Sequence, residues 1–268
     1  MKKAIAILVL GLIVSFNAEA AKYVFKNTLY EDSDIVTKKD LTSFQKLTFE
    51  EEGKKIRSWD RREETSSGWK KSEFKVFIFK ATFEKGHDII IRVNAEFKTK
   101  KKAEKQALKY GKRVGQLPNF LRKNLKIITI HRGDKRWSGS SDGIMVHTNY
   151  FVGDLANNQG LRTKAVKYIG EVMLHEAAHV SLDFNWDGSI IRSEWIAAQK
   201  ADKKFISKFA ADYSVREDIA ETVIMWVAVR CKADRISKSN YKKILKAIPN
   251  RIKYFDEQNY DTYPLVCK

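Results

Sequence analysis

Hydrophobic and polar positions alternate along the first half of the chain in a way that predicts strands. Residues 74–83 and 89–97 are runs of aromatic and β-branched residues separated by a short polar turn, which is the pattern of a β-hairpin. Residues 125–131 and 144–149 are further apolar runs, and between them lie residues 133–143, a loop rich in Gly, Ser and Asp. We therefore expect a small sheet in this half of the chain.

The second half repeats its apolar residues at helical spacing instead. One helix is expected after Thr163, a residue type that caps helix N-termini, and others over residues 216–230 and 238–248. A further helix, residues 100–116, falls within the strand-rich half and ends near Pro118. Strands that precede a group of helices predict the α+β class, with a small mixed sheet followed by a helical C-terminal half.

The helix after Thr163 carries the most specific motif of the chain, His175-Glu176-Ala177-Ala178-His179. Residues four apart lie on one face of a helix, so the rings of His175 and His179 can reach one metal ion. Glu176 can then take a proton from a water molecule that the metal activates. A chain of this length contains such a motif by chance about once in a hundred cases. The sequence therefore predicts a hydrolytic Zn²⁺ site, one ion per chain, over the alternative of two ordinary helix histidines.

A catalytic zinc needs a third protein ligand. The three-histidine form of the motif requires Gly at position 182 and His at position 185, where this chain has Leu182 and Asn185, so that class is excluded. Asp183 lies eight residues after His175, which is about 12 Å along a helix and too far for one metal ion to bind both. We expect Asp183 to support a ligand histidine or to cap the helix.

Two glutamates near the start of the next helix are the better candidates. Glu217 and Glu221 share one helical face. If that face packs on the motif helix, Glu217 can be the third ligand while Glu221 accepts a hydrogen bond from the other nitrogen of a ligand histidine. The reverse assignment, with Glu221 as the ligand, stays open. So does the interpretation that these acids only complement the positive end of the helix dipole.

The two motifs together resemble the glutamate-type zincins, with the catalytic domain of anthrax lethal factor and the Pro-Pro endopeptidases as the nearest named likeness. The resemblance implies that Glu217 is the zinc ligand and that an edge strand above the motif helix receives the substrate. Residues 144–149 would be that strand, and His147 could face the cleft, although a lone strand histidine is more often structural. The lethal-factor-like enzymes have a catalytic tyrosine seven residues before the ligand glutamate, where this chain has Ala210. Tyr213 lies four residues before Glu217 and could take this role, or it could be a partly buried structural aromatic residue.

Over nearly the whole mature chain, the sequence is also similar to uncharacterised secreted proteins of bacteria and animals. The shared blocks are residues 59–62, 93–97, 115–118, 130–134, 175–183, 216–221, 254–256 and 263–264. This likeness implies a fold and a metal but no substrate.

The first twenty residues have the composition of a secretory signal peptide. Lys2 and Lys3 precede an apolar run over residues 4–14, and residues 18–20 offer small side chains at the cleavage positions. Eleven apolar residues are too few to span a bilayer. We expect a soluble monomer without a transmembrane segment, exported to the periplasm or the medium. No linker or repeat divides residues 21–268, so we expect one zincin-like domain with an N-terminal extension (21–68) and a β-hairpin (about 69–97).

The mature chain is strongly basic. Its formal charge of +18 falls to +17 after removal of the leader. This charge favours contact with anionic envelope polymers, but no nucleic-acid-binding signature accompanies it. The densest lysine run, residues 98–105, is interrupted by Ala103 and followed by Ala107 at helical spacing, so we interpret it as a solvated helix face.

Cys231 and Cys267 are the only cysteines. In an oxidising compartment they can form a disulfide that ties the C-terminal tail to the end of the Glu217 helix, and two free thiols are the alternative.

These features predict a secreted zinc metallopeptidase, an endopeptidase acting on peptides or proteins, with Glu176 as the general base. A toxin that cleaves one host protein falls within the same prediction. The alternative is a non-catalytic zincin-scaffold protein that binds envelope polymers through its basic surface.

Overall fold

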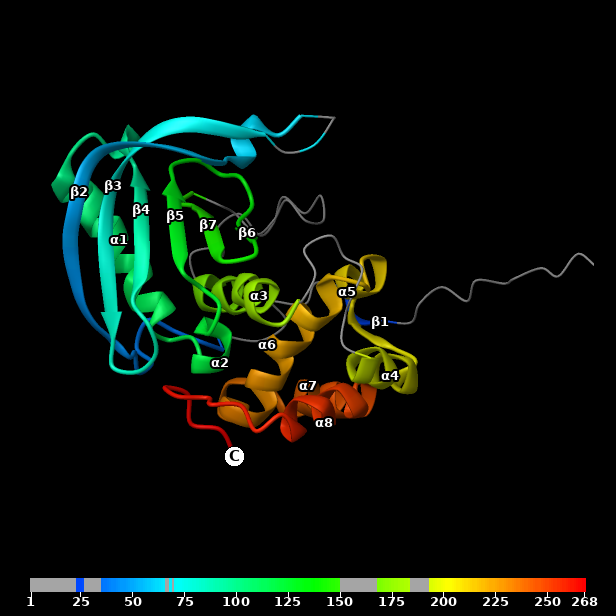
Figure 1. The fold of residues 1–268 in the computed structure, drawn as a ribbon. Coiled ribbons are helices and arrows are strands. Elements are labelled where there is room, and N and C mark those ends of the chain that lie inside the picture. The colour runs from blue at the N-terminus through cyan, green and yellow to red at the C-terminus, as the bar shows by residue number, and fades with distance from the viewer. Residues whose placement is uncertain (1–22, 27–34, 66–67, 69, 150–167, 184–192) are drawn as a thin grey trace, which may run out of the picture.

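The computed structural model describes residues 23–26, 35–65, 68, 70–149, 168–183 and 193–268. It confirms the α+β class, with a mixed sheet in the first half of the chain and several helices in the second (Figure 1). The sheet has six strands in the order β2-β3-β4-β5-β7-β6. These are β2 (Phe44–Trp59), β3 (Lys71–Phe83), β4 (Ile89–Asn94), β5 (Ile127–His131), β7 (Gly143–His147) and β6 (Ser138–Gly139).

The predicted hairpin is present as the antiparallel pair β3 and β4. Strands β4, β5 and β7 run parallel to one another, so their carboxyl ends meet at one edge of the sheet. Helix α1 (Lys100–Val114) covers one face of the sheet, with Thr99 as its cap. Ala103 and Ala107 of α1 are buried while the lysines over residues 98–105 are exposed, which confirms the solvated-face interpretation.

The structure departs from two expectations about the main sheet. Residues 44–59, which we placed in the N-terminal extension, form β2, the longest strand described, at one edge of the main sheet. Residues 144–149 were expected to be the other edge strand. Instead β7 is an inner strand, and the short β6, taken from the predicted loop, pairs antiparallel with it and forms the edge.

The helical half is built on two buried helices, α3 (Ile169–Ser181) and α6 (Glu217–Cys231), which pack on each other. Every residue of α3 is buried, and so are all residues of α6 from Asp218 to Val229. Thr163, the predicted cap, lies outside the described residues. The remaining helices are α2 (Asn119–Arg122), α4 (Ser193–Asp202), α5 (Lys208–Asp212), α7 (Lys238–Ala247) and α8 (Pro249–Glu257). The predicted helix 238–248 is α7, and Pro249 opens α8 directly after it.

A second, two-stranded sheet lies beside these helices. In it β1 (Tyr23–Phe25) pairs in parallel with β8 (Phe205–Ser207), and β8 leads directly into α5.

The N-terminus of α6 is fixed by a fully buried ion network. The guanidinium of Arg251, on α8, binds the carboxylates of Asp218 and Asp202. The side-chain amide of Gln199, on α4, donates to the second oxygen of Asp218 at 2.9 Å. Burial raises the pKa of Asp218 to about 6, and Arg251 opposes this rise. The network joins α4, α6 and α8 at the residue that follows Glu217.

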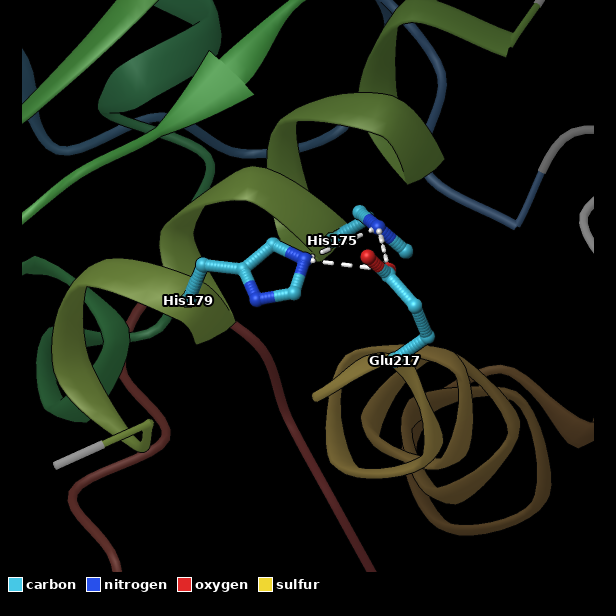
Figure 2. Close-up of side chains that lie close together, drawn as sticks. All are labelled: His175, His179 and Glu217. Atoms are coloured by element: carbon cyan, nitrogen blue, oxygen red, sulfur yellow. Dashed lines mark hydrogen bonds and ion pairs between the residues drawn. The ribbon is translucent and has the colours of Figure 1, made fainter. Parts of the chain in front are cut away.

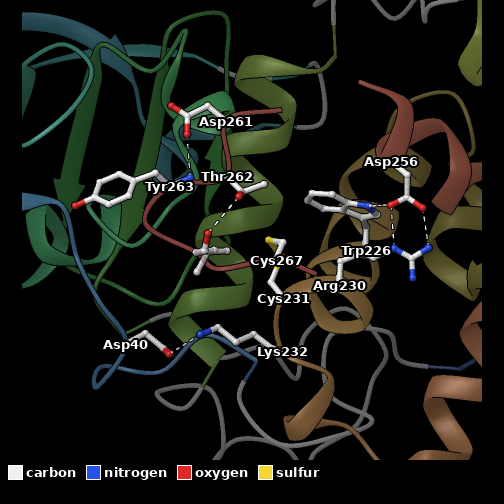
Figure 3. The surroundings of a disulfide bond; sticks show 11 residues. Asp40, Trp226, Arg230, Cys231, Lys232, Asp256, Asp261, Thr262, Tyr263 and Cys267 are labelled. Atoms are coloured by element: carbon white, nitrogen blue, oxygen red, sulfur yellow. Dashed lines mark hydrogen bonds and ion pairs between the residues drawn. A yellow bond between two sulfur atoms is a disulfide. The ribbon is translucent and has the colours of Figure 1, made fainter. Parts of the chain in front are cut away.

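At the other end of α6, Cys231 and Cys267 form the predicted disulfide (Figure 3). The backbone N–H of Lys268 also donates to the carbonyl of Arg230 at 2.9 Å. The C-terminal tail is thereby attached to the end of α6.

None of the described helices is both long and apolar enough to cross a bilayer. The predicted signal peptide lies outside the described residues.

Candidate metal centre

Three side chains from the two buried helices meet at one point (Figure 2). His175 and His179 lie one turn apart on α3, and Glu217 is the first residue of α6. The Nε2 atoms of the two histidines are 3.2 Å apart. Oxygen Oε2 of Glu217 lies 3.1 Å from Nε2 of His175 and 3.2 Å from Nε2 of His179.

These distances match the requirements of a metal ion. Tetrahedral bonds of about 2.0–2.1 Å place neighbouring ligand atoms about 3.3 Å apart. The three atoms therefore have the spacing of three corners of such a tetrahedron, and within the described part of the chain no further His, Cys, Asp or Glu is grouped with them. This cluster, in which both histidines are buried, could hold a metal ion.

Both histidines direct their other ring nitrogen at a carboxylate. Nδ1 of His175 lies 3.1 Å from Glu221, whose second oxygen accepts a hydrogen bond from the hydroxyl of Ser207. Nδ1 of His179 lies 3.6 Å from Asp183. A carboxylate at Nδ1 favours the tautomer that leaves Nε2 free for a metal. The geometry thus brings Glu217 to the cluster and puts Glu221 and Asp183 behind the histidines.

The histidines and Glu217 of the cluster shift one another's pKa values toward their charged forms. Burial lowers the pKa of His175, but Glu217 and Glu221 outweigh it and hold this pKa well above the ordinary histidine value. Burial acts in the same way on His179, and Asp183 and Glu217 raise its pKa to about 9. Burial raises the pKa of Glu217, yet the two histidines keep it far below its usual range. A metal ion bound at the two Nε2 atoms would replace the proton on each Nε2 and leave the Nδ1 protons in place.

Glu176 lies beside the cluster at the edge of the main sheet. Its Oε2 accepts a 2.5 Å hydrogen bond from the backbone N–H of Gly139, in β6. The edge strand touches α3 so closely that a Cβ at Gly139 would lie 2.2 Å from the carbonyl oxygen of Glu176. We did not predict Gly139 from the sequence, because a glycine in a Ser- and Gly-rich loop gives only a turn signal.

An aromatic residue of α5, Phe209, lies next to the cluster, and a second one, Tyr213, directly follows this helix. The ring of Phe209 stacks toward His175 with centroids 6.4 Å apart, and Tyr213 contacts Phe209 edge-on at 5.2 Å. The carbonyl of Tyr213 accepts the N–H of Glu217 at 2.9 Å. Its side chain is 59 % exposed, so it is not a core aromatic residue, and its hydroxyl forms no hydrogen bond with the described residues. Ala210 is fully buried.

His147 does not face this cluster. It is buried at the end of β7, where its ring stacks on that of His131 and its Nε2 lies 3.6 Å from Asp60. Arg62 binds both oxygens of the Asp60 carboxylate. The suggestion that His147 could face the cleft is therefore wrong, and the structural alternative holds.

Comparisons with known proteins gave no match. The chain matches no family model, no curated protein and no solved structure. The interpretation of the site therefore depends on its own geometry.

Proposed function

We propose that this protein is an exported, zinc-dependent peptidase with a zincin-like fold. The observation that supports it most strongly is the trio of donor atoms of His175, His179 and Glu217, spaced 3.1–3.2 Å apart with Glu176 beside them. Two imidazoles and one carboxylate with an open fourth position are the ligand set of catalytic zinc sites. A purely structural metal site has no use for an uncoordinated glutamate next to it.

Each residue has a distinct task in this proposal. Bound zinc would supply a Lewis acid that polarises the scissile carbonyl and lowers the pKa of a water molecule. Glu176 accepts the proton of that water and passes it to the leaving amine. The N–H of Gly139 holds the Glu176 carboxylate in place, while Glu221 and Asp183 fix the histidine rings.

The substrate backbone would bind along β6. This strand pairs on one side with β7, and among the described residues no strand pairs with its other side. An extended peptide can add itself there as a further strand directly above α3. Tyr213, exposed and one turn before Glu217, is our candidate for stabilising the transition state through its hydroxyl.

The decisive experiment measures metal content by mass spectrometry on the purified mature protein, together with cleavage of a proteome-derived peptide library. One zinc per chain and chelator-sensitive cleavage are expected for the wild type. Glu217→Ala should lose most of the metal, whereas Glu176→Gln should keep the zinc and lose hydrolysis by at least about a hundredfold. Tyr213→Phe should keep the zinc and lower kcat.

Other outcomes would change the proposal in defined ways. Retained turnover in Glu176→Gln would show that Glu176 is not the general base. Metal loss mainly in Glu221→Ala would show that Glu221, and not Glu217, is the third ligand. A metal-free protein that cleaves nothing but binds anionic polymers in a salt-sensitive way would favour the envelope-binding alternative.

A further inference from the structure

The outer face of helix α1 is densely basic. A helix turns by about 100° per residue, which puts the exposed Lys101, Lys105 and Lys112 on the side opposite the buried Ala103 and Ala107. From Lys101 to Lys112 this face is about 17 Å long. We call it the lysine face.

The charges of the lysine face are not neutralised within the described part of the chain. Residues 98–112 contain one acid, the exposed Glu104, and seven exposed lysines: Lys98, Lys100, Lys101, Lys102, Lys105, Lys109 and Lys112. None of these lysines forms an ion pair with another described residue. Lys100 and Lys109 place their ammonium groups over the rings of Phe49 and Tyr110. Even without these two, five lysines stand against a single carboxylate.

An apolar side chain is exposed among these lysines. Leu108 lies two turns after Lys101 and one turn before Lys112, so it shares their face, and it is 38 % exposed. A hydrated anionic polymer offers a leucine no apolar partner. The interface of a bilayer does, because a helix that lies in the plane of the membrane buries its apolar side chains just below the headgroups while its lysines bind them.

The basic surface continues beyond the C-terminal end of α1. The hydroxyl of Thr42 donates to the carbonyl of Lys112 at 2.9 Å, which holds residues 37–42 beside this end of the helix. The acid of this segment, Asp40, is already paired with Lys232 and Arg235. The exposed side chains of the segment are Lys38, Lys39 and Leu41.

We propose that α1 is a docking surface for a bilayer that contains anionic phospholipid. The helix would lie along the membrane, with the lysines at the lipid phosphates and Leu108 between the headgroups. Helix α1 packs on β2, β3 and β4, whereas the motif helix α3 packs on β6 and β7 (Figure 1). Docking through the outer face of α1 therefore leaves the free edge of β6 open. The inference does not depend on the proposed peptidase function.

The test measures co-sedimentation of the purified mature protein with vesicles at physiological ionic strength. Vesicles of equal parts phosphatidylcholine and phosphatidylglycerol should bind the wild type, and vesicles of phosphatidylcholine alone should not. The triple variant Lys101→Gln, Lys105→Gln, Lys112→Gln should bind about a hundredfold more weakly, since each lysine near an anionic surface contributes about fivefold. Leu108→Gln should weaken vesicle binding by about fivefold.

The matched control removes the same number of charges from another helix. Lys238, Lys242 and Lys246 are exposed and lie one turn apart on α7. Their triple change to Gln gives the same net charge as the α1 variant and should alter vesicle binding by less than threefold. Thermal unfolding and zinc content should match the wild type in both triple variants.

Three results would overturn the inference. The wild type could fail to sediment with the anionic vesicles, or the two triple variants could lose binding equally, which would make net charge the cause. Soluble polyphosphate serves as the polymer probe. If the wild type binds it and Leu108→Gln leaves vesicle binding unchanged, the lysine face recognises an anionic polymer and not a bilayer.

Discussion

At position 139 the main sheet and the motif helix come closer than any side chain allows. In Gly139→Ala the new methyl group would lie 2.2 Å from the carbonyl oxygen of Glu176 and 2.9 Å from Cβ of His179. Strand β6 must then move away from α3, which takes the Gly139 N–H away from Glu176. We expect a loss of kcat of about a hundredfold with the zinc content retained. Metal analysis and peptide kinetics on the same sample check this, and full activity in the variant would show that the contact is dispensable.

The carboxylates behind the histidines make a second residue-scale prediction. Glu221→Gln and Asp183→Asn keep the shape of each side chain but remove the negative charge that fixes the rings of His175 and His179. We expect each variant to bind zinc about 10–100 times more weakly, as measured by competition with a chelator of known affinity. Glu194→Gln, an exposed change on α4, is the control and should bind zinc like the wild type. Unchanged affinity in Glu221→Gln would show that Glu221 does not support His175.

At this scale, the sequence predicts the residues whose relation is set by their spacing along one helix. It does not predict those that come together only when separate segments pack. His175, Glu176 and His179 were predictable because a fixed spacing on one helix determines their relation. Glu217 depends on how two helices pack, so the sequence only narrowed the choice to two glutamates. Gly139 and Phe209 belong to segments that meet the motif helix only in the folded chain, and their own neighbours in the sequence give no indication of it.

At the scale of elements, a buried cluster joins the end of β2 to the ends of β4 and β5. Nδ1 of His131 accepts hydrogen bonds from Arg62 at 3.2 Å and from Asn94 at 3.1 Å, and Asp60 lies 3.6 Å away. Burial lowers the pKa of His131 to about 3, although Asp60 opposes the change. The ring is therefore neutral in the folded protein at neutral pH, and the charges beside it are those of the buried Asp60 and the partly exposed Arg62.

This neutral histidine predicts a pH dependence of stability. The unfolded chain takes up a proton near pH 6.5, whereas folded His131 does so only near pH 3. The free energy of unfolding should therefore fall as the pH drops from about 6.5 to 3, by up to about 1.4 kcal/mol per pH unit from this group. Urea unfolding between pH 7 and 4 measures the slope, which should be shallower in His131→Asn. Equal slopes in both proteins would contradict the prediction.

The elements that we failed to predict share a physical cause. Strand β2 exposes many of its side chains at the edge of the sheet, so its sequence lacks the alternation by which strands are recognised. Strand β6 has two residues, which is too short for any pattern. Helices α1 and α7 were predictable because one face of each is buried and the other exposed.

At the scale of the whole molecule, the disulfide closes a long segment of chain. Cys231 and Cys267 are 36 residues apart, and a loop of this length removes unfolded-state entropy equivalent to about 3–4 kcal/mol. The double variant Cys231→Ala, Cys267→Ala should lose about this much stability in chemical unfolding. It should keep its zinc, because Glu217 lies at the opposite end of α6, about 21 Å away. Loss of metal in this variant would show that the two ends of α6 are coupled.

The two edges of the main sheet differ in what they can pair with. Strand β2 carries Glu51, Glu52, Lys54 and Lys55 along its outer edge, and its pairing with β3 is interrupted by several irregularities. Charged side chains and irregular edges discourage strands of other molecules from joining a sheet. Strand β6 at the opposite edge is uncharged and lies against α3. Two copies of this protein are thus kept from joining edge to edge through β2, and the concentrated protein should resist fibril formation at that edge. In the proposed function, extended chains would instead join the sheet at β6, beside the residues that would bind the metal.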